Sequence, residues 1–343
     1  MADYRDVMSV GMDFMRSRII LTAAELDFWG YLRERAYTGE ELADRLGLDP
    51  RGTSRVLDCL VGFGLLEKEG GRYRATDQGA RYASNHPESV RPMLLHMIRL
   101  WDNWTSLTEI VRRGTPPERK PGTGMSEESR RAFIGAMHAI GRDLSADVAG
   151  GYDAGRYRKL LDIGGASGTY TIAFLKKNPV LKAILFDLDS VIPMARERLS
   201  AEGLLDRVEL VAGDFYRDEL PRGCDFALLS AIIHQNGGEE NLELYRKVFR
   251  AIEPGGTLLI RDHIMDETRT KPPAGAVFAI NMLVNTSDGD TFTFEEVEAG
   301  LVEAGFTDVA LVRRGERMDG LVEARKPARG KTQDVTTPGT RGE

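Results

Sequence analysis

The chain has 343 residues, of which 42% are hydrophobic, and this length is enough for about two packed domains. Its net charge of −7 argues against a protein that binds nucleic acid or an anionic membrane over its whole surface. The two cysteines, Cys59 and Cys224, have neither metal-type spacing nor that of a disulfide framework, so we expect a reducing, cytoplasmic location. We find no secretory h-region and no run of about 18 apolar residues, so we expect no membrane partner.

Residues 1–110 form the first expected domain, and their pattern is mostly helical. Thr38 is placed to cap a helix, Glu41 three residues later completes a capping box, and Gly47 is placed to end this helix. A second helix with an apolar stripe follows, and then a hairpin that turns at residues 70–71. A helix, a turn, a helix and a hairpin in this order predict a winged helix.

Winged helices often bind DNA, so a DNA-binding regulator is the alternative function from another class. Residues 38–85 contain eight acidic and seven basic residues, which gives a net charge of 7 − 8 = −1. The second helix offers Arg51 and Arg55 to phosphates, but it also carries Asp58. We therefore expect a structural or dimerising role for this domain, with no nucleic-acid partner.

The rest of the chain divides into three parts. Residues 111–156 are expected to form connecting helices, and residues 327–343, which are polar and without periodicity, a disordered tail. Residues 157–326 alternate strands with helices, which predicts a doubly wound α/β sheet with crossover helices. The expected strands lie within KLLDIG, KAILFDL, VELVAGDF, CDFALLSAIIH, GTLLIRDHI and TDVALVRR.

A glycine-rich loop follows the first of these strands, in Asp162-Ile163-Gly164-Gly165-Ala166-Ser167-Gly168. Glycines at this place let the backbone turn tightly and approach a ligand, and the next helix directs its N-terminus toward that ligand. The glycine spacing is not G-x-G-x-x-G, and no Gly-Lys-Ser/Thr follows. Phosphate binding is therefore not favoured.

Acidic residues also stand at the ends of the second and third strands. Asp187 is placed to accept both hydroxyls of a ribose. Asp214, in Gly213-Asp214-Phe215, suits the amino edge of a purine, and Phe215 offers a face on which the base can pack. Three such features at successive strand ends, in this order, predict a pocket that binds adenosine but has no phosphate-binding loop.

A histidine, His234, stands at the end of the fourth strand, in LLSAIIHQNGGEEN. It is interpreted either as a polar residue that ends a buried strand or as a general base that faces a cleft. A histidine suits the second role, because its ordinary pKa of about 6.5 lets it accept a proton near neutral pH.

Together these motifs resemble the S-adenosylmethionine-dependent small-molecule O-methyltransferases of the caffeate and acetylserotonin type. The resemblance covers most of residues 10–325 and is carried by LLDIGGASG, FDLDSVI, VAGDFY, LLSAIIH and IEPGGTLLIRD. It implies a homodimer formed by a winged-helix-like N-terminal domain, a Rossmann-like methyltransferase domain, and connecting helices that line the substrate pocket. It also implies S-adenosyl-L-methionine as cofactor, S-adenosyl-L-homocysteine as product, and a small aromatic or hydroxylated metabolite as acceptor.

The same resemblance implies which residues bind the cofactor. The glycine loop would frame its methionine part, Asp187 its ribose, and Asp214 with Phe215 its adenine. Ser230 stands where the family usually has a lysine, four residues before the histidine. The full implied set is Asp162, Gly164, Gly165, Gly168, Asp187, Leu188, Gly213, Asp214, Phe215 and Ser230.

The resemblance also implies the catalytic pair. His234 falls on the family's base, the first residue of its His-Asp-Trp motif, and Asp262 falls where an acid orients that base. Such an enzyme mainly aligns a hydroxyl with the methyl group and removes its proton. Here Gln235-Asn236 replaces Asp-Trp, and Thr291 stands near the place of a second acid. These departures leave C-methylation, or a non-methylating reaction on the same fold, as the alternative.

Four further residues fall in segments that the family uses to line the acceptor pocket: Met137, His138, Met282 and Asn285. Apolar and Met-rich stripes at helical spacing also fit a plain hydrophobic core. No set of His, Cys and carboxylate residues has metal-ligand spacing, so we expect no metal.

Overall fold

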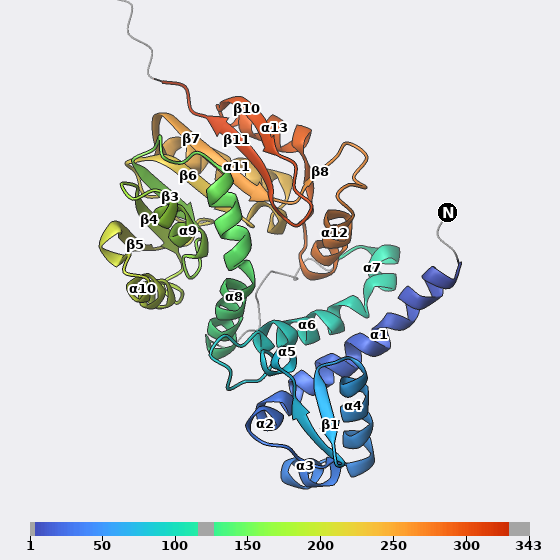
Figure 1. Ribbon diagram of the computed structural model, residues 1–343. Helices are drawn as coiled ribbons and strands as arrows, with labels where there is room; N and C mark the ends of the chain where they lie inside the picture. Colours follow the sequence, from blue (N-terminus) through green and yellow to red (C-terminus); the bar gives the residue numbers. More distant parts are fainter. Residues whose placement is uncertain (1–3, 116–126, 329–343) are drawn as a thin grey trace, which may run out of the picture. The chain divides into compact units, whose positions relative to one another are not determined.

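The computed structural model describes residues 4–115 and 127–328, and the chain divides into two compact units (Figure 1). The first comprises Met1–Ser145 and Leu283–Ser287, and the second comprises Ala146–Met282 and Asp288–Glu343. The division expected from the sequence, with boundaries at 110 and 156, stays a prediction. From residue 329 on, the expected tail lies outside the described residues. Within the described ranges, no helix combines the length and apolarity that crossing a membrane requires.

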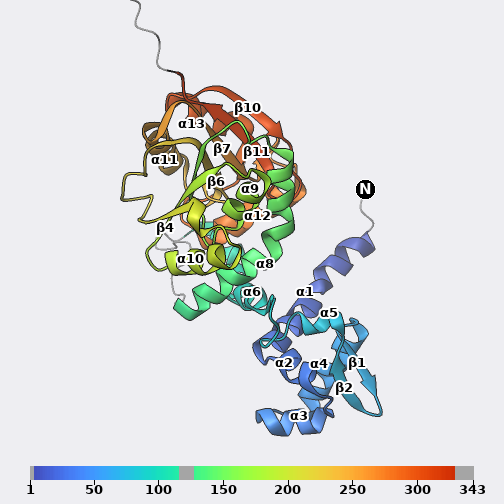
Figure 2. The ribbon, with the colours of Figure 1, turned by 60° about the vertical axis from the view of Figure 1, so that its left-hand side comes forward.

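The first unit is built from helices and one hairpin, and its local signals act as the sequence predicts. The Thr38 hydroxyl accepts from the Glu41 N–H at 3.1 Å, and the Glu41 carboxylate accepts from the Thr38 N–H at 2.9 Å. Gly47, with φ +65°, ends that helix, and Gly70 and Gly71 turn the hairpin with positive φ (Figure 2). The elements are α1 Tyr4–Glu25, α2 Phe28–Glu34, α3 Gly39–Leu46, α4 Pro50–Gly62, β1 Leu66–Glu69, β2 Arg72–Ala75, α5 Asp77–Ala80, α6 Arg91–Trp104 and α7 Leu107–Arg113.

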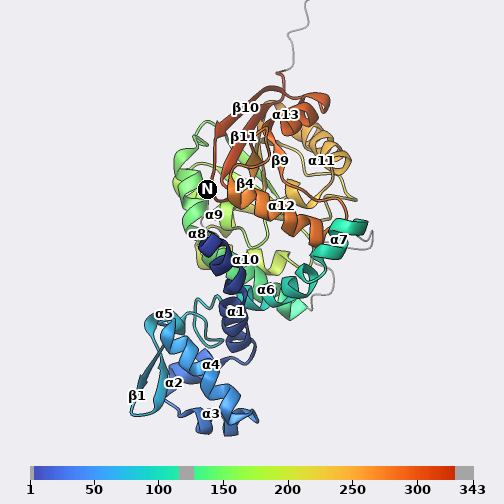
Figure 3. The same ribbon diagram turned by 90° about the vertical axis from the view of Figure 1, so that its right-hand side faces the viewer.

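The core of this unit gathers around Phe28 and Trp29 of α2, which pack with Leu57 and Leu60 of α4. The long helix α1 packs against α6 (Figure 3). Helix α8, Glu127–Gly151, crosses the boundary at Ser145 and so contributes to both units.

Several cationic side chains of the helix-and-hairpin segment are held by carboxylates. Arg72 pairs with Glu41 at 2.6 Å, and Lys68 pairs with Asp58 at 2.8 Å. Arg55, on the would-be recognition helix, lies 3.5 Å from the same Asp58 carboxylate. These pairs reduce the positive charge that this segment offers to phosphates.

The second unit contains a seven-stranded sheet in the order β10-β11-β7-β6-β3-β4-β5. Neighbours from β7 to β5 pair in parallel, which confirms the doubly wound α/β fold. Strand β11, which the sequence does not predict, lies antiparallel between β7 and β10. The strands are β3 Lys159–Ile163, β4 Lys182–Asp187, β5 Val208–Ala212, β6 Cys224–Ser230, β7 Ile252–Asp262, β10 Thr307–Arg313 and β11 Gly320–Arg325.

Crossover helices connect these strands and complete the unit. They are α9 Thr169–Lys177, α10 Ile192–Ala201, α11 Gly238–Ala251 and α13 Phe294–Glu303, with short turns η1 Leu205–Arg207 and η2 Ile233–Gln235. Helix α12, Pro273–Asn285, follows a two-residue strand, β8 Ile264–Met265, which pairs with β9 Phe292–Thr293.

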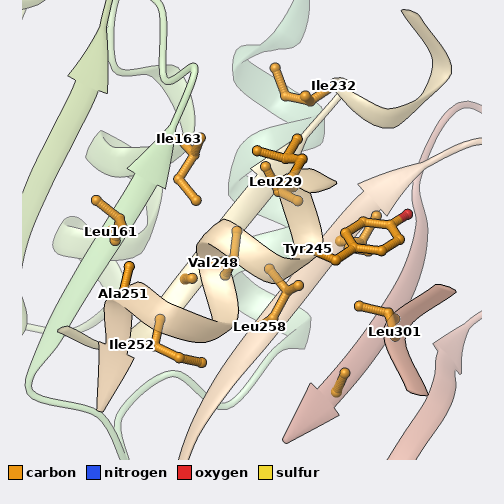
Figure 4. Packing of buried hydrophobic residues seen from close by; sticks show 14 of the residues in the cluster. Leu161, Ile163, Leu229, Ile232, Tyr245, Val248, Ala251, Ile252, Leu258 and Leu301 are labelled. Atoms are coloured by element: carbon orange, nitrogen blue, oxygen red, sulfur yellow. The ribbon is translucent and has the colours of Figure 1, made fainter. Parts of the chain in front are cut away.

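The largest core cluster lies between the sheet and helices α11 and α13 (Figure 4). Alternate residues of neighbouring strands, among them Leu161, Leu229 and Leu258, point at Val248 of α11, and all four are fully buried. Leu301 anchors α13 against this cluster. Removing apolar surface from water contributes about 25 cal/mol per Å², so burial of this cluster stabilises the unit.

We predict that Leu301→Ala lowers the unfolding free energy by roughly 2–5 kcal/mol, because a fully buried leucine leaves a cavity. Val302→Ala, one residue later on the same helix but 56% exposed, should change it by at most about 0.5 kcal/mol. Urea denaturation followed by circular dichroism measures both variants. Equal losses from the two would contradict the packing described for α13.

Candidate functional site

Five parallel strands end at one edge of the sheet and bring polar residues from distant parts of the chain to it. The carboxyl ends of parallel strands form the usual ligand-binding edge of such folds. The residues at or just beyond these five strand ends are Asp162, Asp187, Asp214, Ser230 and Asp262.

The glycine loop after β3 is shaped by close approaches. Gly164 has φ +70°, and a Cβ there would lie 2.7 Å from the Ile232 side chain. Ala166 also has a positive φ, +50°, and its N–H donates to the Asp187 carboxylate at 2.8 Å. The Leu188 N–H donates to the other Asp187 oxygen at 2.7 Å. The loop and the end of β4 are therefore joined through one carboxylate.

Asp162, at the base of this loop, is a buried carboxyl group that is 1% exposed. Burial, with a smaller contribution from the charge of Asp187, raises the pKa of Asp162 to about 6. The Thr171 hydroxyl donates to it at 2.6 Å. Among the described residues no cationic side chain forms an ion pair with it, and the nearby Ser167 hydroxyl, also buried, has no hydrogen-bond partner.

The loop after β5 lies beside the glycine loop. Gly213 donates its N–H to the Asp187 carbonyl at 2.9 Å, and a Cβ on Gly164 would lie 3.5 Å from the Phe215 ring. Asp214 accepts from the Tyr216 N–H at 2.9 Å. The buried Lys247 ammonium of α11 donates to three backbone carbonyls of this loop, those of residues 215, 216 and 218, at 2.8–3.0 Å.

His234 lies in η2, directly after β6, and faces the end of β7. Its Nδ1 is 2.9 Å from both carboxylate oxygens of Asp262. The histidine side chain is 13% exposed, whereas Asp262 is fully buried. Burial acts to raise the pKa of Asp262, but the charge and hydrogen bond of His234 outweigh it and lower that pKa. The Asp262 carboxylate is therefore ionised at neutral pH and accepts a hydrogen bond from the Nδ1–H group of the His234 ring.

The His234 turn is anchored by a hydrogen-bonded chain that the sequence reasoning missed. The Tyr216 hydroxyl donates to the Asn236 side-chain oxygen at 2.5 Å. Asn236, fully buried, donates to the Asn241 oxygen at 3.0 Å, and Asn241 donates to the Ile233 carbonyl at 2.9 Å. The chain ties the loop after β5 to the turn that carries the histidine.

Other residues of this edge were also missed. The Phe278 ring of α12 packs edge-on against the His234 ring, 4.9 Å between centroids, and also lies 5.2 Å from the His263 ring. Arg261, the residue before Asp262, is buried and donates to the Ser230 hydroxyl at 2.9 Å. A charged residue inside the apolar strand TLLIRD is the one sequence signal that points to it.

The four expected acceptor-pocket residues belong to both units. Met137 is 44% exposed and His138 is buried, and both lie on α8 in the first unit. Asn285, also in the first unit, accepts from the Asn103 amide at 2.6 Å. Met282 is buried in the second unit. Their shared role stays a prediction.

The comparison with known proteins decides the family. The model of the O-methyltransferase domain matches residues 104–307, and the model of the O-methyltransferase dimerisation domain matches residues 9–85. The chain belongs to the S-adenosylmethionine-dependent O-methyltransferases. The family resemblance stated from the sequence is therefore confirmed.

Relatives and solved structures agree with this placement of the methyltransferase. It is 32% identical to the tetracenomycin polyketide synthesis 8-O-methyl transferase TcmO of Streptomyces glaucescens, over 89% of this chain and 91% of the relative. It is 30% identical to the 3-hydroxy-5-methyl-1-naphthoate 3-O-methyltransferase of Streptomyces sahachiroi, over 87% and 88%. The crystal structure of human N-acetylserotonin methyltransferase in complex with S-adenosylmethionine matches with a TM-score of 0.80 and 26% identity, over 95% and 98%.

The residues of this edge fit the family's cofactor. The cofactor carries a sulfonium and an ammonium group, and the edge supplies the buried Asp162 carboxyl, which has no ion-pair partner among the described residues. Its adenosine needs acceptors and a flat apolar surface, and Asp187, Asp214 and the half-buried Phe215 have this chemistry. In the described part of the chain, no cluster of three or more His, Cys, Asp or Glu side chains is placed to hold a metal.

We predict that Asp162→Asn makes the methyltransferase more stable than wild type at pH 7 but not at pH 4. The raised pKa means that the folded state favours the protonated Asp162 carboxyl. In the wild type, the stability that comes from this protonated group is fully present below about pH 4 and is lost as the pH rises through about 6. The gain at pH 7 is at most about 3 kcal/mol, since one pKa unit is about 1.4 kcal/mol.

Urea unfolding at both pH values measures this difference. Asp189→Asn, an exposed carboxyl after β4, controls for the change in net charge. A stability difference between Asp162→Asn and wild type that is the same at pH 4 and pH 7 would refute the burial argument.

Proposed function

We propose that this methyltransferase methylates a hydroxyl group of a small aromatic metabolite, with His234 as the general base. The observation that carries the proposal is the pairing of the His234 Nδ1 atom with the buried Asp262 carboxylate at 2.9 Å. The pairing matters because it fixes the tautomer of the ring.

An ionised carboxylate has only acceptor oxygens, so Nδ1 must carry the proton in this pair. The Nε2 lone pair of neutral His234 is then free to accept a proton from an acceptor hydroxyl. When Nε2 becomes protonated, the Asp262 carboxylate stabilises the resulting positive charge. The edge-on contact with Phe278 limits rotation of the ring, so the base keeps one orientation.

The proposed cofactor contacts follow the strand ends. When bound, S-adenosyl-L-methionine supplies a methyl group on a sulfonium, which is already a good leaving group. The glycine loop would receive the methionine part, Asp187 and Leu188 the ribose, and Asp214 and Phe215 the adenine. The chain's own task is then to hold the acceptor oxygen in line and to remove its proton.

The relatives support the proposed acceptor class. The name of the naphthoate enzyme describes a hydroxyl on an aromatic ring as its methylation site, and that of TcmO describes O-methylation in polyketide synthesis. We propose that Met137, His138, Met282 and Asn285 line the pocket for a comparable acceptor. C-methylation and non-methylating chemistry remain the alternatives that product analysis distinguishes.

We also propose a homodimer, because a family dimerisation domain matches residues 9–85. The apolar residues Val7, Val10 and Phe14 of α1 are more than half exposed, which suits a surface that a second copy covers. The winged-helix nature of the α3–β2 segment and a cytoplasmic location stay predictions from the sequence.

We predict that His234→Ala lowers kcat by roughly 10²–10⁴, the usual contribution of a general base, with cofactor affinity nearly unchanged. Turnover of radiolabelled cofactor with a hydroxynaphthoate acceptor, together with calorimetry of S-adenosyl-L-homocysteine, measures the two quantities. Asp262→Asn is the companion variant: it keeps the size of the side chain but can stabilise the wrong tautomer, so it should lower kcat while cofactor affinity stays. Wild-type turnover in His234→Ala would remove the histidine from the mechanism.

We predict that Asp187→Ala weakens binding of S-adenosyl-L-homocysteine by roughly 10- to 100-fold, because it removes a charged acceptor and frees the Ala166 and Leu188 N–H groups. Asp189→Ala, two residues later and exposed, is the matched control and should keep wild-type affinity. Isothermal titration calorimetry gives both constants. Equal affinity in Asp187→Ala and wild type would contradict the ribose assignment.

A further inference from the structure

The carboxyl edge of the sheet is rich in acids, and this raises a problem for one part of the cofactor. Asp162, Asp187, Asp214 and Asp262 all lie at or next to these strand ends. Acids suit a sulfonium and an ammonium group, but they repel the α-carboxylate of the methionine part. A cation at this edge would offset that repulsion.

Arg261 is the cation that the fold places there. It lies near the end of β7, next to Ser230 of β6 in the strand register, and its side chain is only 6% exposed. Its Nε donates to the Ser230 hydroxyl at 2.9 Å and its Nη1 to the Met318 carbonyl at 2.8 Å. Its guanidinium lies 4.7 Å from the centre of the Tyr170 ring, in the first turn of α9 directly after the glycine loop.

The charge of Arg261 has no ion-pair partner among the described residues. Of the nearby acids, Asp262 pairs with His234 at 2.9 Å and Asp319 with Arg313 at 2.6 Å. The Arg261 charge acts to lower the pKa of Asp162 and of Asp262, but it forms a direct ion pair with neither. Lys247, the other buried cation of this region, has three carbonyl acceptors around its ammonium group. A buried charge that no direct ion pair balances is costly, and an anionic ligand lowers that cost.

One further feature favours an anion at the same place. Helix α9 begins directly after the glycine loop, and the dipole of a helix places partial positive charge at its N-terminus.

We propose that Arg261 binds the α-carboxylate of the cofactor's methionine part. The proposal rests on the proposed cofactor site at the glycine loop, and it adds a binding residue outside the motif positions of the family. The positive charge of the guanidinium strengthens a hydrogen bond that it donates to a carboxylate. Nη2 is the donor group left for this contact, since Nε and Nη1 are used by Ser230 and Met318.

Calorimetry with two ligands on the full-length protein tests the proposal. S-adenosyl-L-homocysteine carries the carboxylate, and S-adenosyl-3-thiopropylamine is the same molecule without it. The wild type should bind the first at least 10-fold more tightly, the range of a charge-assisted hydrogen bond. Arg261→Gln should reduce this ratio to nearly one and leave the affinity for the decarboxylated ligand within about 3-fold of wild type.

Two variants separate the proposal from a structural role. Arg261→Lys keeps the charge and should retain part of the preference for the carboxylate, which also covers the case that Arg261→Gln does not fold. Asp187→Ala should weaken both ligands by the same factor, because both contain the ribose. Equal weakening of both ligands in Arg261→Gln, or a wild type without preference for the carboxylate, would overturn the proposal. No turnover is measured, so failure of His234 as the base leaves this result unaffected.

Discussion

Parallel pairing of β5, β4, β3, β6 and β7 is the constraint on which the rest of the second unit depends. Helices α9, α10 and α11 make three of the four connections between these strands, and the strands are largely apolar. Polar side chains gather where the strands end. The same geometry that buries Leu161, Leu229 and Leu258 thus gathers the acids, the histidine and Arg261 at one edge.

The sequence predicts those parts of the molecule that local chemistry determines. The capping box at Thr38 and Glu41, the glycine turn at residues 70–71 and the strand-helix alternation after residue 157 all depend on neighbours within a few residues. The order of the strand-end motifs adds information, because parallel strands place successive loops side by side. That order is enough to identify the family and its cofactor from the sequence alone.

Features that depend on distant partners were not predictable in the same way. Strand β11 lies antiparallel at a position fixed only by β7 and β10. The bond between Tyr216 and Asn236 joins residues 20 positions apart in two loops. The charge on Arg261 is visible in the sequence, but that it forms no direct ion pair among the described residues emerges only in the fold, where Asp262 and Asp319 have other partners. Sequence patterns give the residue types, and the fold decides the pairing.

The departure from the family's His-Asp-Trp motif can be understood from these pairings. The partner of His234 comes from β7, not from the residue that follows it, so Gln235 in place of the aspartate leaves the Nδ1 contact intact. Asn236, in place of the tryptophan, contacts Tyr216 and Asn241 and fixes the turn through hydrogen bonds. Buried amides of this kind stabilise a structure only when every donor and acceptor is satisfied. Asn236 therefore requires both Tyr216 and Asn241 as partners. The departure from the motif changes how the turn that carries His234 is anchored, but Asp262 still orients the His234 ring.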